Sequence, residues 1–206
     1  MTPRHHPSAE ILAAYSSGLL EPGFGLVVGV HVQSCPECGR RVRAFETISG
    51  EALGSLPPVE VGADALSRTL ARLDQEAPTP ERSVASRPIL DRLPLKSKRW
   101  VAPGVWVAPV DTPHSAENRV YVLSVPGGMK SAHHGHSGAE FCTVLQGAYR
   151  DESGVFAAGD FAASDRDAAH QPIVEGREPC VCLFATEGRL KPTGLLGRLA
   201  FALADV

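Results

Sequence analysis

The stretch His-Gly-His-Ser-Gly-Ala-Glu, residues 134–140, decides the fold expected of the second half of this 206-residue chain. His134 and His136 are two residues apart, and Glu140 follows four residues later with the same parity. Residues two apart on a β-strand point to the same face of the sheet. We therefore expect His134, His136 and Glu140 to face one metal ion, with His170 as a further ligand from a loop-like segment. The alternative is that these histidines only make a polar turn.

Glycines flank this stretch at fixed distances. Gly128 lies six residues before His134, and Gly147 lies seven residues after Glu140. This pattern resembles the first signature motif of the cupin family. The resemblance implies a small antiparallel β-barrel with a metal in its mouth, and it gives His170 the role of the lone histidine of the second motif. The Pro-x-Gly expected before that histidine is absent, and the segment begins Gly-Asp-Phe at residues 159–161 instead.

The rest of the second half agrees with an all-β barrel or sandwich. Runs of β-favouring residues separated by Gly, Asp and Ser turns occupy residues 105–109, 120–125, 141–145, 155–158 and 180–185. Strand parity points Cys142 and Val144 inward with Glu140, and we expect Cys142 to be a buried, inert thiol rather than a redox-coupled one. Cys180 and Cys182 share a strand face. They are interpreted as two small apolar residues rather than an oxidisable pair, because a disulfide between them on an extended strand would be strained.

The sequence of the first third of the chain predicts short helices near several cysteine and histidine residues. Helices are expected from Ser8 to about residue 18, over residues 22–33, from about 34 to 54, and over 63–76, where Leu66, Leu70 and Leu73 share one face. Ser34 and Glu37 have the spacing of a capping box that would start the third helix.

Three residues of the types that bind zinc lie within one stretch of eight residues, 31–38. His31 and Cys35 are four residues apart, and Cys38 follows three residues later; imidazole and thiolate are the preferred ligands of tetrahedral zinc. A fourth ligand must come from elsewhere, and His5 and His6 are the candidates. Such a site would staple helices that have little core of their own.

The spacing H-x-x-x-C-x-x-C with a histidine about 25 residues upstream resembles the zinc-binding anti-sigma domain of bacteria. His6 fits the family's spacing, and His5 is the near miss. The resemblance implies three helices tied at the zinc and a fourth that embraces an extracytoplasmic-function type sigma factor. The alternative is a structural zinc module with another partner.

Composition excludes several classes of function. The formal net charge of −3 gives no electrostatic footprint for nucleic acid, and no second ligand pair follows the arginines at 40, 41 and 43, as a DNA-binding finger would need. The start of the chain has no apolar signal region, and no apolar run is long enough to span a bilayer. We therefore expect a cytoplasmic protein with reduced cysteines, no membrane contact and no direct contact with nucleic acid.

The two motifs in this order resemble the ChrR-type anti-sigma factors over essentially the whole chain. The resemblance implies an all-α, zinc-stapled domain at residues 1–76, a Pro-rich linker at 77–97, an all-β cupin barrel at 98–194 and a tail at 195–206. It further implies a non-enzymatic protein that binds one sigma factor in a 1:1 complex and releases it under singlet oxygen or organic hydroperoxide. Zinc is expected in the first domain and as the first choice in the barrel, although three histidines and a glutamate also suit iron, manganese or nickel. The alternatives are a metal-dependent dioxygenase or isomerase with a regulatory zinc module, and a scaffold with two structural zincs.

Overall fold

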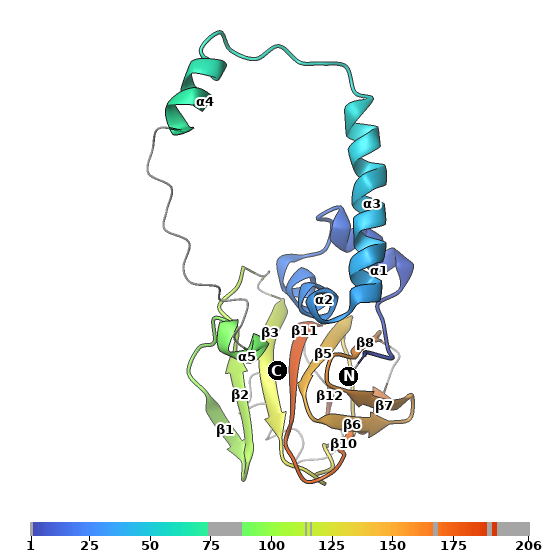
Figure 1. The fold of residues 1–206 in the computed structure, drawn as a ribbon. Helices are drawn as coiled ribbons and strands as arrows, with labels where there is room; N and C mark the ends of the chain where they lie inside the picture. The colour runs from blue at the N-terminus through green and yellow to red at the C-terminus, as the bar shows by residue number, and fades with distance from the viewer. Residues whose placement is uncertain are drawn as a thin grey trace.

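The computed structural model describes residues 2–73, 88–113, 115, 117–166, 169–188 and 191–192. Figure 1 shows a group of helices followed by a β-barrel, which confirms the expected fold class. The helices are α1 (Ala9–Ser16), α2 (Pro22–Ser34), α3 (Pro36–Gly54), α4 (Ala65–Leu73) and α5 (Ile89–Arg92). The strands are β1 (Arg99–Ala102), β2 (Val105–Pro109), β3 (Asn118–Val125), β4 (His134–Gly135), β5 (Glu140–Gln146), β6 (Ala148–Asp151), β7 (Gly154–Ala157), β8 (Phe161–Ser164), β9 (Ala169–His170), β10 (Ile173–Val174), β11 (Cys180–Glu187) and β12 (Lys191–Pro192).

Side-chain caps mark the start of the first two helices. The Ser8 hydroxyl accepts a hydrogen bond from the backbone N–H of Ile11 and caps α1. Helix α2 starts with Pro22, and the Glu21 carboxylate accepts from the N–H of Gly23. The glycine-rich sequence of α2 is a poor helix former. Its stability comes from burial, since Val27 and Val28 are completely inaccessible to solvent.

The start of α3 differs from the prediction. Ser34 is the last residue of α2, and its hydroxyl donates to the carbonyl oxygens of Val30 and His31. Cys35, in an extended conformation, is the residue before α3, and its sulfur accepts from the N–H of Cys38. The capping box at Ser34 is therefore wrong, because the chain turns one residue later to bring the Cys35 sulfur inward.

The barrel is built from antiparallel strands. One sheet has six strands in the order β1-β2-β3-β11-β5-β8, and two three-stranded sheets have the orders β10-β6-β7 and β12-β4-β9. Each of the five predicted strand runs overlaps a strand of the structure. Among the strands that the sequence reading missed, β4 and β9 matter most, because their pairing sets His134 directly opposite His170.

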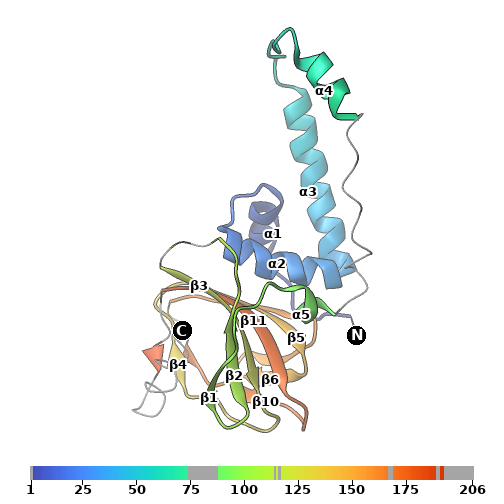
Figure 2. The same ribbon diagram turned by 90° about the vertical axis from the view of Figure 1, so that its left-hand side faces the viewer.

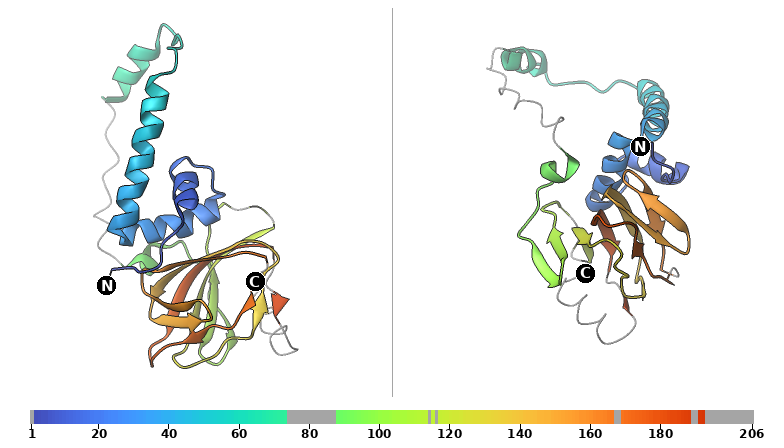
Figure 3. Two further views of the ribbon diagram at one scale, coloured as in Figure 1. Left: turned by 90° about the vertical axis from the view of Figure 1, so that its right-hand side faces the viewer. Right: turned by 60° about the horizontal axis from the view of Figure 1, so that its bottom comes forward.

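The helical region packs on the outer face of the large sheet. Helix α2 contacts β3, β5 and β11, as Figure 2 and Figure 3 show from different sides. The ring of Phe24 on α2 meets the ring of Phe141 on β5 edge to face, with centroids 4.9 Å apart. The Thr143 hydroxyl donates to the carbonyl of Val27 over 3.0 Å. The helices and the large sheet therefore share one hydrophobic cluster, and the barrel has two further clusters of its own.

Beyond this layer, α3 and α4 extend away from the barrel (Figure 1). The buried residues of α3 all lie in its first two turns, ending at Val42. Helix α4 has no buried residue, and its leucines at 66, 70 and 73 are 70%, 52% and 76% exposed. The predicted apolar face of the fourth helix therefore exists, and no described residue of this helix is buried.

The predicted linker lies only partly in the described residues. Residues 77–87 and the predicted tail at 195–206 fall outside them, as do residues 74–76 of the fourth helix. The second half of the linker contains the single turn of α5, and Leu95 forms an isolated β-bridge with Val110. Leu90 and Leu93 pack against the shared cluster. This segment therefore follows the barrel surface, whereas the domain boundaries themselves stay predictions.

Candidate metal centres

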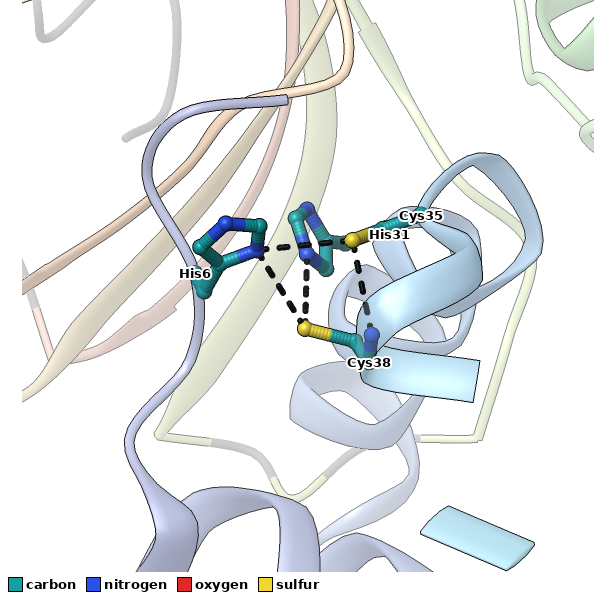
Figure 4. Close-up of side chains that lie close together, drawn as sticks. All are labelled: His6, His31, Cys35 and Cys38. Atoms are coloured by element: carbon teal, nitrogen blue, oxygen red, sulfur yellow. Dashed lines mark hydrogen bonds between the residues drawn. The ribbon is translucent and has the colours of Figure 1, made fainter. Parts of the chain in front are cut away.

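Four side chains converge where α2 meets α3. The donor atoms of His6, His31, Cys35 and Cys38 all lie within 4.8 Å of one another (Figure 4). The Nδ1 atom of His6 lies 3.4 Å from each cysteine sulfur, and the Nε2 atom of His31 lies 3.3 Å from the sulfur of Cys38. Zinc–nitrogen and zinc–sulfur bonds of about 2.0 and 2.3 Å in a tetrahedron separate the two ligand atoms by roughly 3.5 Å. The four side chains fit a closed tetrahedral zinc site.

The chemistry of these groups points to the same ion. Burial raises the pKa of the Cys38 thiol to about 12, so a thiolate there needs a neighbouring cation. Burial lowers the pKa of His31, which keeps its imidazole neutral and able to bind metal. Both cysteine side chains and His31 are buried.

The structure separates the two candidates for the fourth ligand. His6 points into the cluster, as Figure 4 shows. His5 points away, with its Nε2 atom 3.0 Å from the carbonyl oxygen of Val155 and its ring in tilted contact with that of Phe156. The geometry therefore favours His6, as the family spacing does.

A second cluster lies in the barrel. The imidazoles of His134, His136 and His170 each offer a nitrogen within 4.8 Å of the others. The Nε2 atoms of His134 and His170 are 3.2 Å apart, close to the roughly 3.3 Å between two nitrogens on tetrahedral zinc. Both ring nitrogens of His136 are buried and lack a hydrogen-bond partner in the described structure. A metal ion would satisfy one of them. His170 lies on β9 and not in a loop, and the short β4–β9 pairing is what brings it to His134.

Glu140 lies beside this cluster. Its Oε2 atom is 3.6 Å from Nδ1 of His136 and has no hydrogen-bond donor among the described residues. Burial raises the pKa of this carboxyl to about 8. The glutamate is not among the three groups that converge most closely, so its role as a fourth ligand stays a prediction. A cation bound to the three imidazoles would favour the charged carboxylate and could draw it in.

Asp151 is a functional residue that the sequence reading missed. Its Oδ2 atom lies 2.9 Å from Nδ1 of His170, and the carboxylate is 5% exposed. This contact turns Nε2 of His170 toward the cluster, as carboxylate–histidine pairs do in metal sites. The backbone carbonyl of Ala132 does the same for His134 at 2.9 Å. Asp151 stands in an Asp-Glu-Ser-Gly turn that the sequence marks only as punctuation between strands.

A cavity of about 1130 Å³ reaches from the barrel interior to this cluster. Its walls include Tyr121, Leu123, Cys142, Tyr149, Cys182 and Phe184, and also Lys130, whereas Arg150 pairs with Glu175 at the surface. The predicted inward direction of Cys142 is confirmed. The sulfurs of Cys180 and Cys182 are 3.6 Å apart as free thiols. Hydrogen bonds to neighbouring thiols, followed by burial, raise the pKa of both. A short distance between two thiols is not evidence of oxidation, so the interpretation of Cys180 and Cys182 as small apolar residues is kept.

Comparisons with known proteins agree with this architecture. Residues 94–190 match the family described as the ChrR cupin-like domain. The anti-sigma-E factor ChrR of Cereibacter sphaeroides is 36% identical over 206 aligned residues, which cover 97% of each chain. This chain belongs to the ChrR family of anti-sigma factors. The crystal structure of Rhodobacter sphaeroides SigE in complex with the anti-sigma factor ChrR contains a chain with a TM-score of 0.77 and 36% identity, covering 90% of this chain and 100% of that one.

Among the described residues, no helix combines the length and the hydropathy needed to cross a bilayer.

Proposed function

We propose that this chain sequesters a sigma factor of the extracytoplasmic-function class in a 1:1 complex, and that its cupin domain is required for release under oxidative stress. The observation that carries the proposal is the apolar surface of α3 and α4, whose large side chains are exposed in the part of the chain that the structure describes. The proposal also draws on the likeness to a ChrR chain that was crystallised with SigE.

The apolar surface has the character of a binding helix. A nine-residue helix such as α4 is marginal in water on its own, and its leucines are more than half exposed. On α3, Ile48 and Leu53 are 63% and 69% exposed. Burying one such side chain contributes roughly 1.5–3 kcal/mol. A partner held between α3 and α4 would therefore gain affinity from several of these contacts.

The two metal centres have different roles in this proposal. The four-ligand site of His6, His31, Cys35 and Cys38 is closed by protein groups and would hold the helices in place. The site of His134, His136, Glu140 and His170 opens onto the cavity, where an oxidant can reach it. A signal shifts the equilibrium only if it changes the free energy of one state more than the other. Oxidation of a ligand or loss of the metal at the open site would do so; zinc is our first choice there.

The test is binding to the extracytoplasmic-function sigma factor of the same organism, measured by titration calorimetry with the zinc-loaded full chain. Leu66→Asp and Leu70→Asp should each weaken binding by 10-fold or more, because a charge enters the buried contact. Leu19→Asp is the matched control, since Leu19 is 80% exposed on the α1–α2 connection. Unchanged affinity in both α4 variants would contradict the proposed surface.

A cupin oxygenase or isomerase is the competing function, because the cavity joins Tyr149 and Lys130 to the histidine cluster. We propose that the chain is not an enzyme. His136→Ala separates the two functions. Retained sigma binding with lost release by singlet oxygen or hydroperoxide supports the sensor. Oxygen consumption by the iron-loaded chain that His136→Ala abolishes would support the enzyme.

A further inference from the structure

The turn between β7 and β8 of the barrel touches the zinc-type cluster of the helical region. The carbonyl oxygen of Gly159 accepts a hydrogen bond from Nδ1 of His31 over 2.7 Å. The next residue, Asp160, accepts from the backbone N–H groups of Arg4 and His5, which directly precede His6, over 2.5 and 3.1 Å. Two of the four metal ligands are therefore held by one turn of the other domain.

We infer that this β7–β8 turn is part of the N-terminal zinc site, and that Asp160 is a positioning residue that raises the affinity of the helical domain for zinc. The inference concerns metal affinity and does not depend on sigma-factor binding.

The N-terminal segment needs such an anchor. His6 lies before α1, in a stretch with no regular secondary structure. Ordering the backbone of a residue costs about 1–2 kcal/mol, so a free segment would present His6 weakly. The backbone N–H of Phe161 donates to the carbonyl of His5 over 3.1 Å, and the His5 ring contacts that of Phe156 at a tilt of 34°. The barrel thus holds the residue next to the ligand on both sides of its backbone.

Asp160 is suited to this task by its burial and its bonding. It is 2% exposed, and its Oδ2 atom also accepts from the N–H of Ala157 over 2.8 Å. Three backbone N–H groups therefore point at one carboxylate. An asparagine at this position would turn its NH₂ group toward at least one of these donors, because only one of its two side-chain atoms is an acceptor.

His31 is positioned in the same way. With the proton on Nδ1 and directed at the Gly159 carbonyl, Nε2 keeps its lone pair toward the sulfur of Cys38. Outer contacts of this kind fix the tautomer and direction of a ligand, and their loss typically lowers metal affinity 10- to 100-fold. Linkage is reciprocal, so zinc must strengthen the docking of the barrel by the same factor.

The experiment is a cobalt(II) and zinc competition titration of the full chain. Of the two candidate clusters, only the N-terminal one contains cysteine ligands. The thiolate-to-cobalt charge-transfer band therefore measures cobalt bound at that site and not at the barrel site. Asp160→Asn should weaken metal binding in this band by 10- to 100-fold. Thr143→Val is the matched control. It removes another hydrogen bond between the domains, at Val27, without touching the ligand segment, and should change the affinity less than threefold.

A second measurement uses the unaltered chain, in case Asp160→Asn fails to fold. Zinc added to the metal-depleted chain should slow amide hydrogen exchange at His5 and Phe161 by at least 10-fold, with no change along β11. Equal cobalt affinity in Asp160→Asn and the unaltered chain would overturn the inference. Amide exchange rates at His5 and Phe161 that do not change when zinc is added would overturn it as well.

Discussion

Truncation of Phe24 tests whether the helices and the barrel unfold as one unit. Phe24 is 8% exposed on α2, and its ring meets that of Phe141 on β5 edge to face. Phe24→Ala removes this ring from the cluster that joins the two parts of the molecule. The change removes no metal ligand. Because the barrel turn at Gly159 and Asp160 holds the N-terminal ligand segment, weaker docking should also lower the zinc affinity of that site.

The size of the effect follows from the packing. Burial of a core phenylalanine contributes about 3–5 kcal/mol relative to alanine. An edge-to-face pair adds roughly 0.5–1.5 kcal/mol beyond the buried area. The cavity left behind has a β-strand on one side, which cannot move in to fill it. We therefore expect a loss at the upper end of the 3–5 kcal/mol range, about 5 kcal/mol.

Scanning calorimetry of the metal-loaded chain measures this loss. The unaltered chain should unfold in one transition, and Phe24→Ala should unfold in two, with the helical region melting first. Phe45→Ala is the control, because Phe45 lies on α3 beyond its buried turns and is only partly buried. It should cost about 1–2 kcal/mol and keep one transition. A single transition in Phe24→Ala, with a loss in the free energy of unfolding below about 1 kcal/mol, would refute the reasoning. Removal of a buried aromatic ring from a shared core should cost more than that.

Three further outcomes are expected. Asp151→Asn should speed zinc loss from the barrel site 10- to 100-fold in a chelator assay, because His170 loses its charged partner. In the metal-free chain, stability should peak near pH 6.5 in thermal melts. Unfolded imidazoles bind extra protons below that pH, because burial lowers the pKa of both His134 and His136 to about 4. Folded Glu140 keeps a proton up to about pH 8, and its single proton opposes the two histidines only in part below pH 6.5. Gly147→Ala should destabilise the barrel by about 2 kcal/mol more than Gly128→Ala, measured by urea unfolding, since both have positive φ but only the first places a Cβ 2.5 Å from a carbonyl oxygen.

Each of these outcomes has a control. The fall in stability between pH 6.5 and 8, about 1.4 kcal/mol per unit, should vanish in Glu140→Gln; its persistence would assign the proton to another group. Asp111→Asn removes an exposed aspartate that pairs with Lys96 and should leave zinc loss unchanged. Equal losses in the two glycine variants would mean that the chain around Gly147 moves aside.

Local sequence rules predicted four of the five helices, α1 to α4, and five of the strands. Spacing predicted both histidine-containing clusters, because ligands four and three residues apart, or two apart on a strand, share a face before any tertiary contact forms. The rules were wrong at Ser34, where the need to aim the Cys35 sulfur inward shifted the helix start. They also placed His170 in a loop, because a two-residue strand carries too little sequence signal to predict.

Sequence alone predicted which residues could hold a metal ion, and it predicted the order of the helical and barrel regions. Short-range geometry and ligand chemistry suffice for that. The tertiary structure alone decided which partners hold those ligands. Asp151 reaches His170 across 19 residues, Asp160 anchors the segment before His6 across 155, and Phe24 meets Phe141 from another domain. No local pattern encodes such contacts, because each joins residues that are brought together only when separate elements pack against one another.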